Sequence, residues 1–347
     1  MPIDKSFSNS LMNLITMKAL FFKYKDEILH NIRVFIQPTL VRLFPSRWYS
    51  DRAPDFLIVG LQKCGSTWLA ILLDSHPEIT CIPTILRPGA TKGTKEGHFF
   101  DTLEAIDKDR NLFQIRIIQG HKGFFSDLYQ LVDKVDREEL IRKLVKRYNA
   151  FLLRQKKTSS RLVGDKTPEY IFYLDLIENL YPQIKNICIL RNHCDRIVSF
   201  HYQQIGKKRL KHKVIEDREV EDYCDRIERE YKALLAFKGS IQFIIYENLL
   251  INPLPSLIAM LNYLKVSTDE KLLRNIIEQS RFESLSEDPS KGGRNPRRRT
   301  MFRKGVIGEG QKEMTEAQRK YVYRRLERLT SELMEKYSLD LNHYISF

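Results

Sequence analysis

The residues with the clearest chemical potential lie in one short loop. Gly60 and Gly65 have the spacing of the glycines in a Walker A phosphate loop, G-x-x-x-x-G-K-[ST]. Ser66 stands where that motif has its lysine, and the lysine of this loop is Lys63. Backbone amides and a helix N-terminus in this arrangement suit a compact 5′-phosphate group, with Lys63 reaching the bond that breaks. The alternative is an ordinary turn between a strand and a helix.

A second candidate anion site follows another apolar run. Arg191 comes directly after residues 187–190, and Ser199 lies eight residues further along, about two helical turns. A guanidinium fork and a hydroxyl held in this way can clamp a second phosphate. Either residue alone would more often be a surface charge or a helix-face serine.

The elements that must position these residues alternate along the chain. Apolar, mostly β-branched runs predict buried parallel strands at 56–59, 79–82, 187–190 and 241–245. Helical patterns predict helices from residue 67, over 138–156 and over 255–264. This order predicts an α/β fold, namely a P-loop-like doubly wound sheet with central parallel strands flanked by helices. Ligands would bind at the carboxyl ends of the strands.

Composition narrows the class of protein. The chain has 347 residues, 42% of them hydrophobic, which is enough for one large α/β domain. A formal net charge of +14 favours a polyanionic partner, and without any nucleic-acid-binding signature we expect a small phosphorylated ligand rather than nucleic acid. The five cysteines are well separated and contain no C-x-x-C pair, so they indicate neither a disulfide framework nor a zinc site. A reducing, cytoplasmic location is expected.

The first 50 residues read as a separate segment. Their apolar stretches, 11–22 and 28–44, are interrupted by charges or by Pro38 and are too short or too polar to span a bilayer. We expect a helical extension over 1–50, either packed on the domain or lying on a membrane surface as a basic amphipathic helix, and a catalytic domain over 51–347. The polar, arginine-rich segment 290–304 predicts a mobile loop.

Together these motifs resemble the sulfotransferase superfamily that uses 3′-phosphoadenosine 5′-phosphosulfate (PAPS). The loop at 63–68 resembles its 5′-phosphosulfate loop, and Arg191 with Ser199 resembles its 3′-phosphate motif. Trp68 and Tyr246 match residues that contact adenine in the cytosolic branch, and 302–308 resembles the late loop that closes on the 3′-phosphate. The similarity runs from about 55 to 315. It implies these donor-binding residues: Lys63, Cys64, Gly65, Ser66, Thr67, Trp68, Arg191, Ser199, Tyr246, Phe302, Arg303, Lys304 and Gly305.

Two further segments resemble the glycan-modifying branch. Residues 95–101 resemble the K-E-x-H-F-F-D segment of heparan sulfate 3-O-sulfotransferases, and 164–170 resemble their E-K-T-P-x-Y segment. The resemblance implies Glu96 as catalytic base, His98 as its helper and Lys166 near donor and acceptor. The chain departs by having Asp165 in place of glutamate and Trp68 where that branch lacks tryptophan. It also has Glu309-Gly310 where the cytosolic late loop reads Asp-Trp.

The same assignments follow from the chemistry of sulfuryl transfer to a hydroxyl. A base must take the proton, and cations must meet the charge that develops on the leaving phosphate. Glu96 is our choice of base, because burial can tune a carboxylate toward neutral pH, and His98 would orient it or share its role. Lys63 would stabilise the bridging oxygen with Lys166 in support, and the reaction needs no metal. The alternative is that Glu96 is only a solvated surface charge. In that case His121 is the next candidate base.

The acceptor stays open at this stage, among a glycan, a glycolipid and a small alcohol or phenol. Two other classes of protein share some of these features. A P-loop nucleotide kinase would require magnesium and a lysine at position 66. A non-catalytic polyanion- or membrane-binding protein would depend on residues 1–50 and on the arginines at 297–299 rather than on Lys63.

Overall fold

The computed structural model describes residues 43, 45–82, 96–101, 103, 104, 135–206, 209, 210, 212–281 and 305–345. The chain divides into two compact units, Met1–Arg52 with Thr102–Phe151, and Ala53–Asp101 with Leu152–Phe347. The strands are β1 (Phe56–Gly60), β2 (Ile79–Ile82), β3 (Leu162–Lys166), β4 (Lys185–Leu190) and β5 (Ile241–Ile245). The helices are α2 (Pro45–Trp48), α3 (Ser66–Ser75), α6 (Arg137–Gln155), the 3₁₀ helix η2 (Pro168–Tyr173), α7 (Leu174–Leu180), α8 (His193–Gly206), α9 (Asp217–Ala236), α10 (Tyr246–Ile251), α11 (Pro253–Leu264), α12 (Glu270–Gln279), α14 (Glu309–Glu313), α15 (Glu316–Tyr337) and α16 (Asn342–Ile345).

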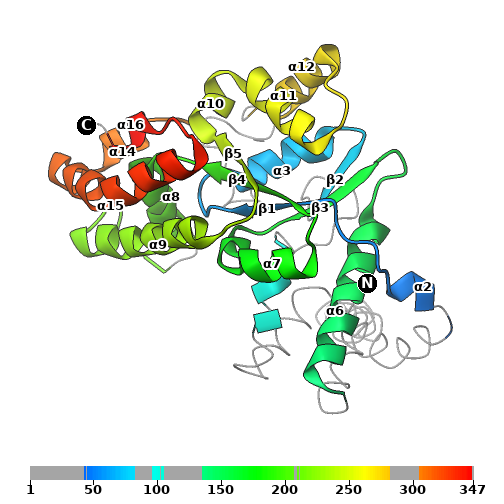
Figure 1. Ribbon diagram of the computed structural model, residues 1–347. Coiled ribbons are helices and arrows are strands. Elements are labelled where there is room, and N and C mark those ends of the chain that lie inside the picture. The colour runs from blue at the N-terminus through cyan, green and yellow to red at the C-terminus, as the bar shows by residue number, and fades with distance from the viewer. Residues whose placement is uncertain are drawn as a thin grey trace, which may run out of the picture. The chain divides into compact units, whose positions relative to one another are not determined.

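The second unit is built on a five-stranded parallel sheet in the order β2-β3-β1-β4-β5. All five residues of β1 are buried, as expected of a central parallel strand that is covered on both faces. In the view of Figure 1, α3, α11 and α12 lie above this sheet and α7 lies below it. The α/β fold predicted from the sequence, with central parallel strands flanked by helices, is therefore confirmed.

The strand order determines where a ligand can bind. The chain leaves β1 at Gly60 between two neighbours, β3 on one side and β4 on the other. Ligands of doubly wound sheets bind at such a switch point, outside the carboxyl ends of the strands. The residues that follow β1, β3 and β4 are Leu61, Thr167 and Arg191, so three predicted site segments meet at this edge of the sheet.

The first unit is described by α2, α6 and the residues beside them. Arg147 of α6 is buried, with its guanidinium carbon 5.0 Å from the ring centre of Trp48 and 4.7 Å from that of Tyr49. Ser50 joins the same helix through its N–H, which lies 3.0 Å from the Lys146 carbonyl oxygen. Trp48 at the end of α2 and the two residues after it are thus held against α6 by cation–π contacts and a backbone hydrogen bond.

The predicted strands and helices are all present among the described residues, with boundaries shifted by no more than two residues. Most of the predicted extension at 1–50 and all of the segment 290–304 lie outside the described residues. In the described part of the chain, no helix combines the length and the apolar character that crossing a bilayer requires. The division at residue 50 and the cytoplasmic location stay predictions.

Candidate active site

The loop after β1 has the backbone geometry of an anion cradle. Lys63 and Gly65 have positive φ angles of 64° and 94°, and α3 begins at Ser66 without a side-chain cap. A Cβ atom added to Gly65 would lie 2.8 Å from the ring of Tyr246, so glycine is required there by both conformation and space. The first amides of α3, which carry the positive end of the helix dipole, are therefore available to an anion.

Two arginines that follow β4 hold this loop from behind. Arg191 Nη1 lies 3.4 Å from the Lys63 carbonyl oxygen, and Arg196 Nε lies 3.2 Å from that of Gln62. Arg196 is fully buried and forms an ion pair with the equally buried Glu230 of α9. These two contacts fix the loop through its carbonyl groups. Neither Arg196 nor Glu230 belongs to the site residues predicted from the sequence.

Arg191 also joins three further segments at the carboxyl end of β4. It is 7% exposed, and its guanidinium carbon lies 4.5 Å from the ring centre of Tyr246. Its Nη2 donates to the Val306 carbonyl oxygen at 3.0 Å, and the same atom lies 3.9 Å from Asp195 Oδ2. The third guanidinium nitrogen, Nε, is buried and has no hydrogen-bond partner among the described residues. A buried cation with an unused donor is suited to an anionic ligand.

The two predicted adenine-contacting rings lie side by side. The ring centres of Trp68 and Tyr246 are 5.9 Å apart in an edge-to-face arrangement, and Trp68 Nε1 donates to the Ser280 carbonyl oxygen at 2.8 Å. This hydrogen bond anchors the indole to the end of α12. Ser199, the predicted partner of Arg191, is half-buried on α8.

The end of the late loop is fixed on the first turn of α8. The N–H groups of Gly308 and Gly310 donate to the two carboxylate oxygens of Asp195, at 2.9 and 2.7 Å. A Cβ atom on Gly310 would overlap the side chain of Cys194, which explains why this chain cannot carry the tryptophan of the cytosolic motif here. Gly305 is described and has a φ of 65°, whereas Phe302, Arg303 and Lys304 lie outside the described residues.

A charged cluster lies where β3 ends beside β1. Lys166, the last residue of β3, is 1% exposed, and its Nζ lies 3.0 Å from Glu96 Oε1 and 3.4 Å from Thr67 Oγ1. The other Glu96 oxygen lies 3.2 Å from His98 Nε2, and His98 Nδ1 lies 3.1 Å from Asp101 Oδ2. Three of the four predicted catalytic residues, Glu96, His98 and Lys166, are thus in contact, and Thr67 links them to the phosphate loop that carries the fourth, Lys63.

The segment around His98 is held by residues that follow β3. Thr167 Oγ1 accepts hydrogen bonds from the N–H groups of Gly97 and His98, at 2.8 and 3.2 Å. The Tyr170 hydroxyl accepts from the Phe99 N–H at 3.0 Å and donates to Asp165 Oδ2 at 2.6 Å. This network fixes His98 in a left-handed conformation with a φ of 51°. These positioning residues were not identified as such from the sequence.

The comparison with protein families decides the class of the chain. A sequence model described as the sulfotransferase family matches residues 54–270, which is more than half of the chain. The chain belongs to the sulfotransferase family. The prediction of a PAPS-dependent sulfotransferase is thereby confirmed at the level of the family.

Individual relatives of this sulfotransferase are distant. Nodulation protein NoeE of Sinorhizobium fredii (strain NBRC 101917 / NGR234) is 29% identical over 140 residues, which cover 39% of this chain and only 28% of that protein. A sulfotransferase from Alicyclobacillus acidocaldarius is 18% identical, with a TM-score of 0.47 and coverage of 85% of this chain and 100% of that one. Mouse sulfotransferase SULT7A1 complexed with PAP is 15% identical, with a TM-score of 0.47 and coverage of 84% and 92%.

The electrostatics of the Glu96 cluster differ from the expectation. Burial raises the pKa of Glu96, but the charge of Lys166 and the hydrogen bonds from His98 and Lys166 outweigh it and lower the pKa to about 2. Burial likewise opposes the charge on His98, yet hydrogen bonds to Asp101 and Glu96 raise its pKa to about 10. The prediction that burial tunes Glu96 toward neutral pH is wrong, because the two cationic neighbours, Lys166 and His98, outweigh the effect of burial.

Two further groups complete the site of this sulfotransferase. Glu169, at the variable position of the 164–170 segment, accepts hydrogen bonds from Gln62 and from Arg226, the latter at 3.2 Å. Burial and the charge of Glu96 raise the pKa of Glu169. Glu169 is therefore a second carboxylate close enough to interact with Glu96. Burial also raises the pKa of the Cys64 thiol to about 12, in line with its assignment as a loop residue rather than a nucleophile.

Proposed function

We propose that this sulfotransferase moves a sulfuryl group from PAPS to a hydroxyl of a glycan, a glycolipid or a small alcohol, with Glu96 as general base. The observation that carries the proposal is the Lys166 ammonium, which lies between Glu96 Oε1 at 3.0 Å and Thr67 Oγ1 at 3.4 Å. One cation thus joins a candidate base to the phosphate loop. That arrangement fits transfer between a donor in the loop and an acceptor beside Glu96.

Two features of the site support an adenosine bisphosphate as the body of the donor. The left-handed turn at Gly65 leads into the uncapped first turn of α3, whose amides suit a phosphate, and the unused Nε of Arg191 suits a second phosphate. In this assignment Lys63 and the amides of 64–67 hold the 5′ end. Arg191 and Ser199 hold the 3′ end, and Trp68 and Tyr246 flank the base. The donor supplies an activated sulfuryl group with the bisphosphate as leaving group.

Lys166 can change partners during the reaction. The positive charge of Lys166, which lies against Glu96, is the largest cause that lowers the pKa of this carboxylate. If Lys166 turns toward an anion in the loop, Glu96 loses that influence and becomes a stronger base at the moment when a donor is bound. Glu96 Oε1 would then take the hydroxyl proton, while Lys166 and Lys63 would meet the negative charge that develops on the leaving oxygen.

His98 serves as a positioning residue in this scheme rather than as a second base. With a pKa raised to about 10 it carries its proton at neutral pH and cannot accept another. Its two nitrogens bridge Glu96 and Asp101, which fixes the carboxylate of Glu96 for the acceptor. Of the two roles considered from the sequence, we therefore favour orientation.

The proposal is tested by incubating the protein with labelled PAPS and a panel of saccharides, glycolipids and phenols, with mass detection of an added SO₃ group. We expect transfer to at least one acceptor class and its loss in Lys63→Ala, while the exposed control Lys271→Ala keeps wild-type activity. Sulfuryl transfer by Lys63→Ala at the wild-type rate would refute the assignment of this loop as the donor-binding loop. Transfer of phosphate from a nucleoside triphosphate with magnesium would instead support the kinase alternative.

A further inference from the structure

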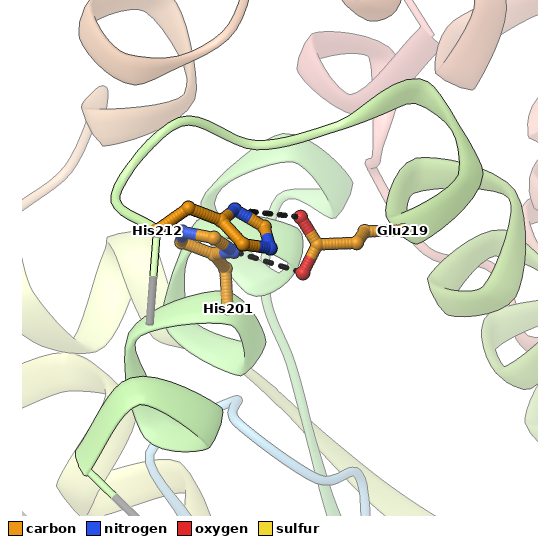
Figure 2. Close-up of side chains that lie close together, drawn as sticks. All are labelled: His201, His212 and Glu219. Carbon is orange, nitrogen blue, oxygen red and sulfur yellow. Dashed lines mark hydrogen bonds and ion pairs between the residues drawn. The ribbon is translucent and has the colours of Figure 1, made fainter. Parts of the chain in front are cut away.

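Three side chains outside the catalytic cluster point toward one another across two helices. They are His201 of α8, His212 in the segment between α8 and α9, and Glu219 in the first turn of α9 (Figure 2). One ligand atom from each lies within 4.8 Å of the others. His201 is fully buried, Glu219 is mostly buried and His212 is 39% exposed. Nothing in the proposed sulfuryl transfer uses these residues.

The hydrogen bonds of His201 define the protonation of its ring. Nε2 lies 3.1 Å from the Lys213 carbonyl oxygen, which can only accept, so Nε2 carries the proton of the neutral ring. Nδ1 lies 3.2 Å from Glu219 Oε1. In the neutral ring a lone pair therefore faces a carboxylate oxygen, and this contact is favourable only when a cation lies between them. That cation is either a proton or a metal ion.

His212 also donates a ring N–H to a backbone carbonyl oxygen. Its Nδ1 lies 2.8 Å from the Val214 carbonyl oxygen and must donate to it, which leaves Nε2 as the lone pair. Carboxylates lie on both sides, with Glu219 Oε2 3.9 Å from Nδ1 and Glu216 Oε1 3.8 Å from Nε2. Histidines that bind metals typically donate their second ring N–H to a backbone carbonyl, which fixes the tautomer. Both histidines here already make that bond.

We propose that His201, His212 and Glu219 bind one Zn²⁺ ion, with water in the fourth position. Ligands about 2.0–2.2 Å from zinc in a tetrahedron lie about 3.3 Å apart, close to the 3.2 Å between His201 Nδ1 and Glu219 Oε1. Two imidazoles and one carboxylate suit zinc better than magnesium or calcium, which prefer oxygen ligands. His212 would ligate through Nε2, which lies 3.8 Å from Glu216 Oε1, so its ring has to turn toward the other two ligands to complete the site.

The ion would act as a clamp between two helices. Glu219 Oε2 accepts the N–H of Glu216 at 3.0 Å as part of the cap of α9, so zinc on Oε1 leaves this cap intact. His201 lies two residues beyond Ser199 on the helix that follows Arg191. Zinc would therefore tie the proposed nucleotide-binding helix α8 to α9. The site is independent of the proposed sulfuryl transfer and of the cysteines.

The test uses the full-length protein, stripped with a chelator and titrated with ZnCl₂ by calorimetry, with the metal content checked by elemental analysis. We expect one zinc per chain. Loss of one of three protein ligands in His212→Ala should weaken binding by about 100-fold. Lys213→Ala is the matched control, because it removes an exposed side chain but keeps the carbonyl that receives His201, and it should bind like the wild type. Circular dichroism establishes that each variant is folded.

A second variant separates ligation from helix capping. Glu219→Gln keeps an oxygen that can accept the N–H of Glu216 but loses the charge, so it should weaken zinc binding while α9 stays intact. The proposal is overturned if the folded wild type takes up no stoichiometric zinc, or if His212→Ala binds zinc as tightly as the wild type. The zinc site and the nucleotide site are tested separately by titrating His212→Ala with adenosine 3′,5′-bisphosphate. If this variant loses zinc but still binds the nucleotide, the proposed nucleotide site stands whatever the outcome for zinc.

Discussion

The exchange of Glu96 for glutamine tests the proposed base with almost no change of shape. A glutamine oxygen can still accept from Lys166 Nζ, which lies 3.0 Å from the carboxylate, but the amide cannot take a proton. General base catalysis contributes about 10²–10⁴-fold, so we expect kcat to fall by at least about 100-fold. The KM for PAPS should change by less than about threefold, because Glu96 contacts the lysine and not the phosphate loop itself.

The same variant has a second, independent readout in the pKa of His98. At the 3.2 Å between His98 Nε2 and Glu96 Oε2, two unit charges attract by about 5 kcal/mol at an effective dielectric constant of about 20. The His98 side chain is 41% exposed, so solvent screening reduces this to about 1.4 kcal/mol, or about one pKa unit. The pKa should therefore fall from about 10 by roughly one unit and stay above 6.5, because Asp101 remains in contact.

Steady-state kinetics and an NMR titration of the imidazole protons measure the two effects, with the exposed Glu335→Gln as control. An unchanged kcat in Glu96→Gln would refute the assignment of the base. An unchanged pKa of His98 would refute the contact between the two side chains. A fall in the pKa with full activity would leave the geometry standing and require another base.

Three further perturbations address the donor site and the pH dependence. Gly65→Ala places a Cβ atom 2.8 Å from an aromatic ring at a φ of 94°, so it should destabilise the protein by about 1–3 kcal/mol in thermal unfolding, and a wild-type melting temperature would contradict the strained loop. Arg191→Ala should weaken binding of the nucleotide by about 10–100-fold in calorimetry, whereas the exposed control Arg229→Ala should not. In the wild type, kcat/KM should hold across neutral pH and decline as His98 loses its proton near pH 10. Asp101→Asn removes a carboxylate that raises this pKa, so the alkaline decline should move to lower pH, and a fixed profile would exclude His98 from the pH dependence.

The strands that could be predicted from the sequence are those in which most side chains are apolar. β1 is a continuous apolar run, and β4 and β5 are apolar over most of their length, so their positions follow from the sequence. β3 was missed because its sequence, Leu-Val-Gly-Asp-Lys, ends on two charged residues and resembles a loop. Its Asp165 and Lys166 are nevertheless buried, and they are satisfied by Tyr170 and Glu96. Such partners come from the tertiary fold and leave no local signal.

In the candidate site, too, features that depend on neighbouring residues could be predicted from the sequence, and features that depend on distant residues could not. The glycine spacing of the loop and the position of Arg191 after a strand could be read from the chain, because both depend on nearby residues. The support of His98 by Thr167 and Tyr170 could not, since the bonded groups are about 70 residues apart. The low pKa of Glu96 was also missed, because burial was weighed without the two cations that surround the carboxylate.

The central claim is that the loop after β1 and Arg191 hold the two ends of one adenosine bisphosphate. Calorimetric titration of the folded full-length protein with adenosine 3′,5′-bisphosphate tests it most directly, since this is the leaving group of the proposed reaction. We expect saturable binding at one site per chain, weakened in both Lys63→Ala and Arg191→Ala. An absence of binding by the folded wild-type protein would contradict it.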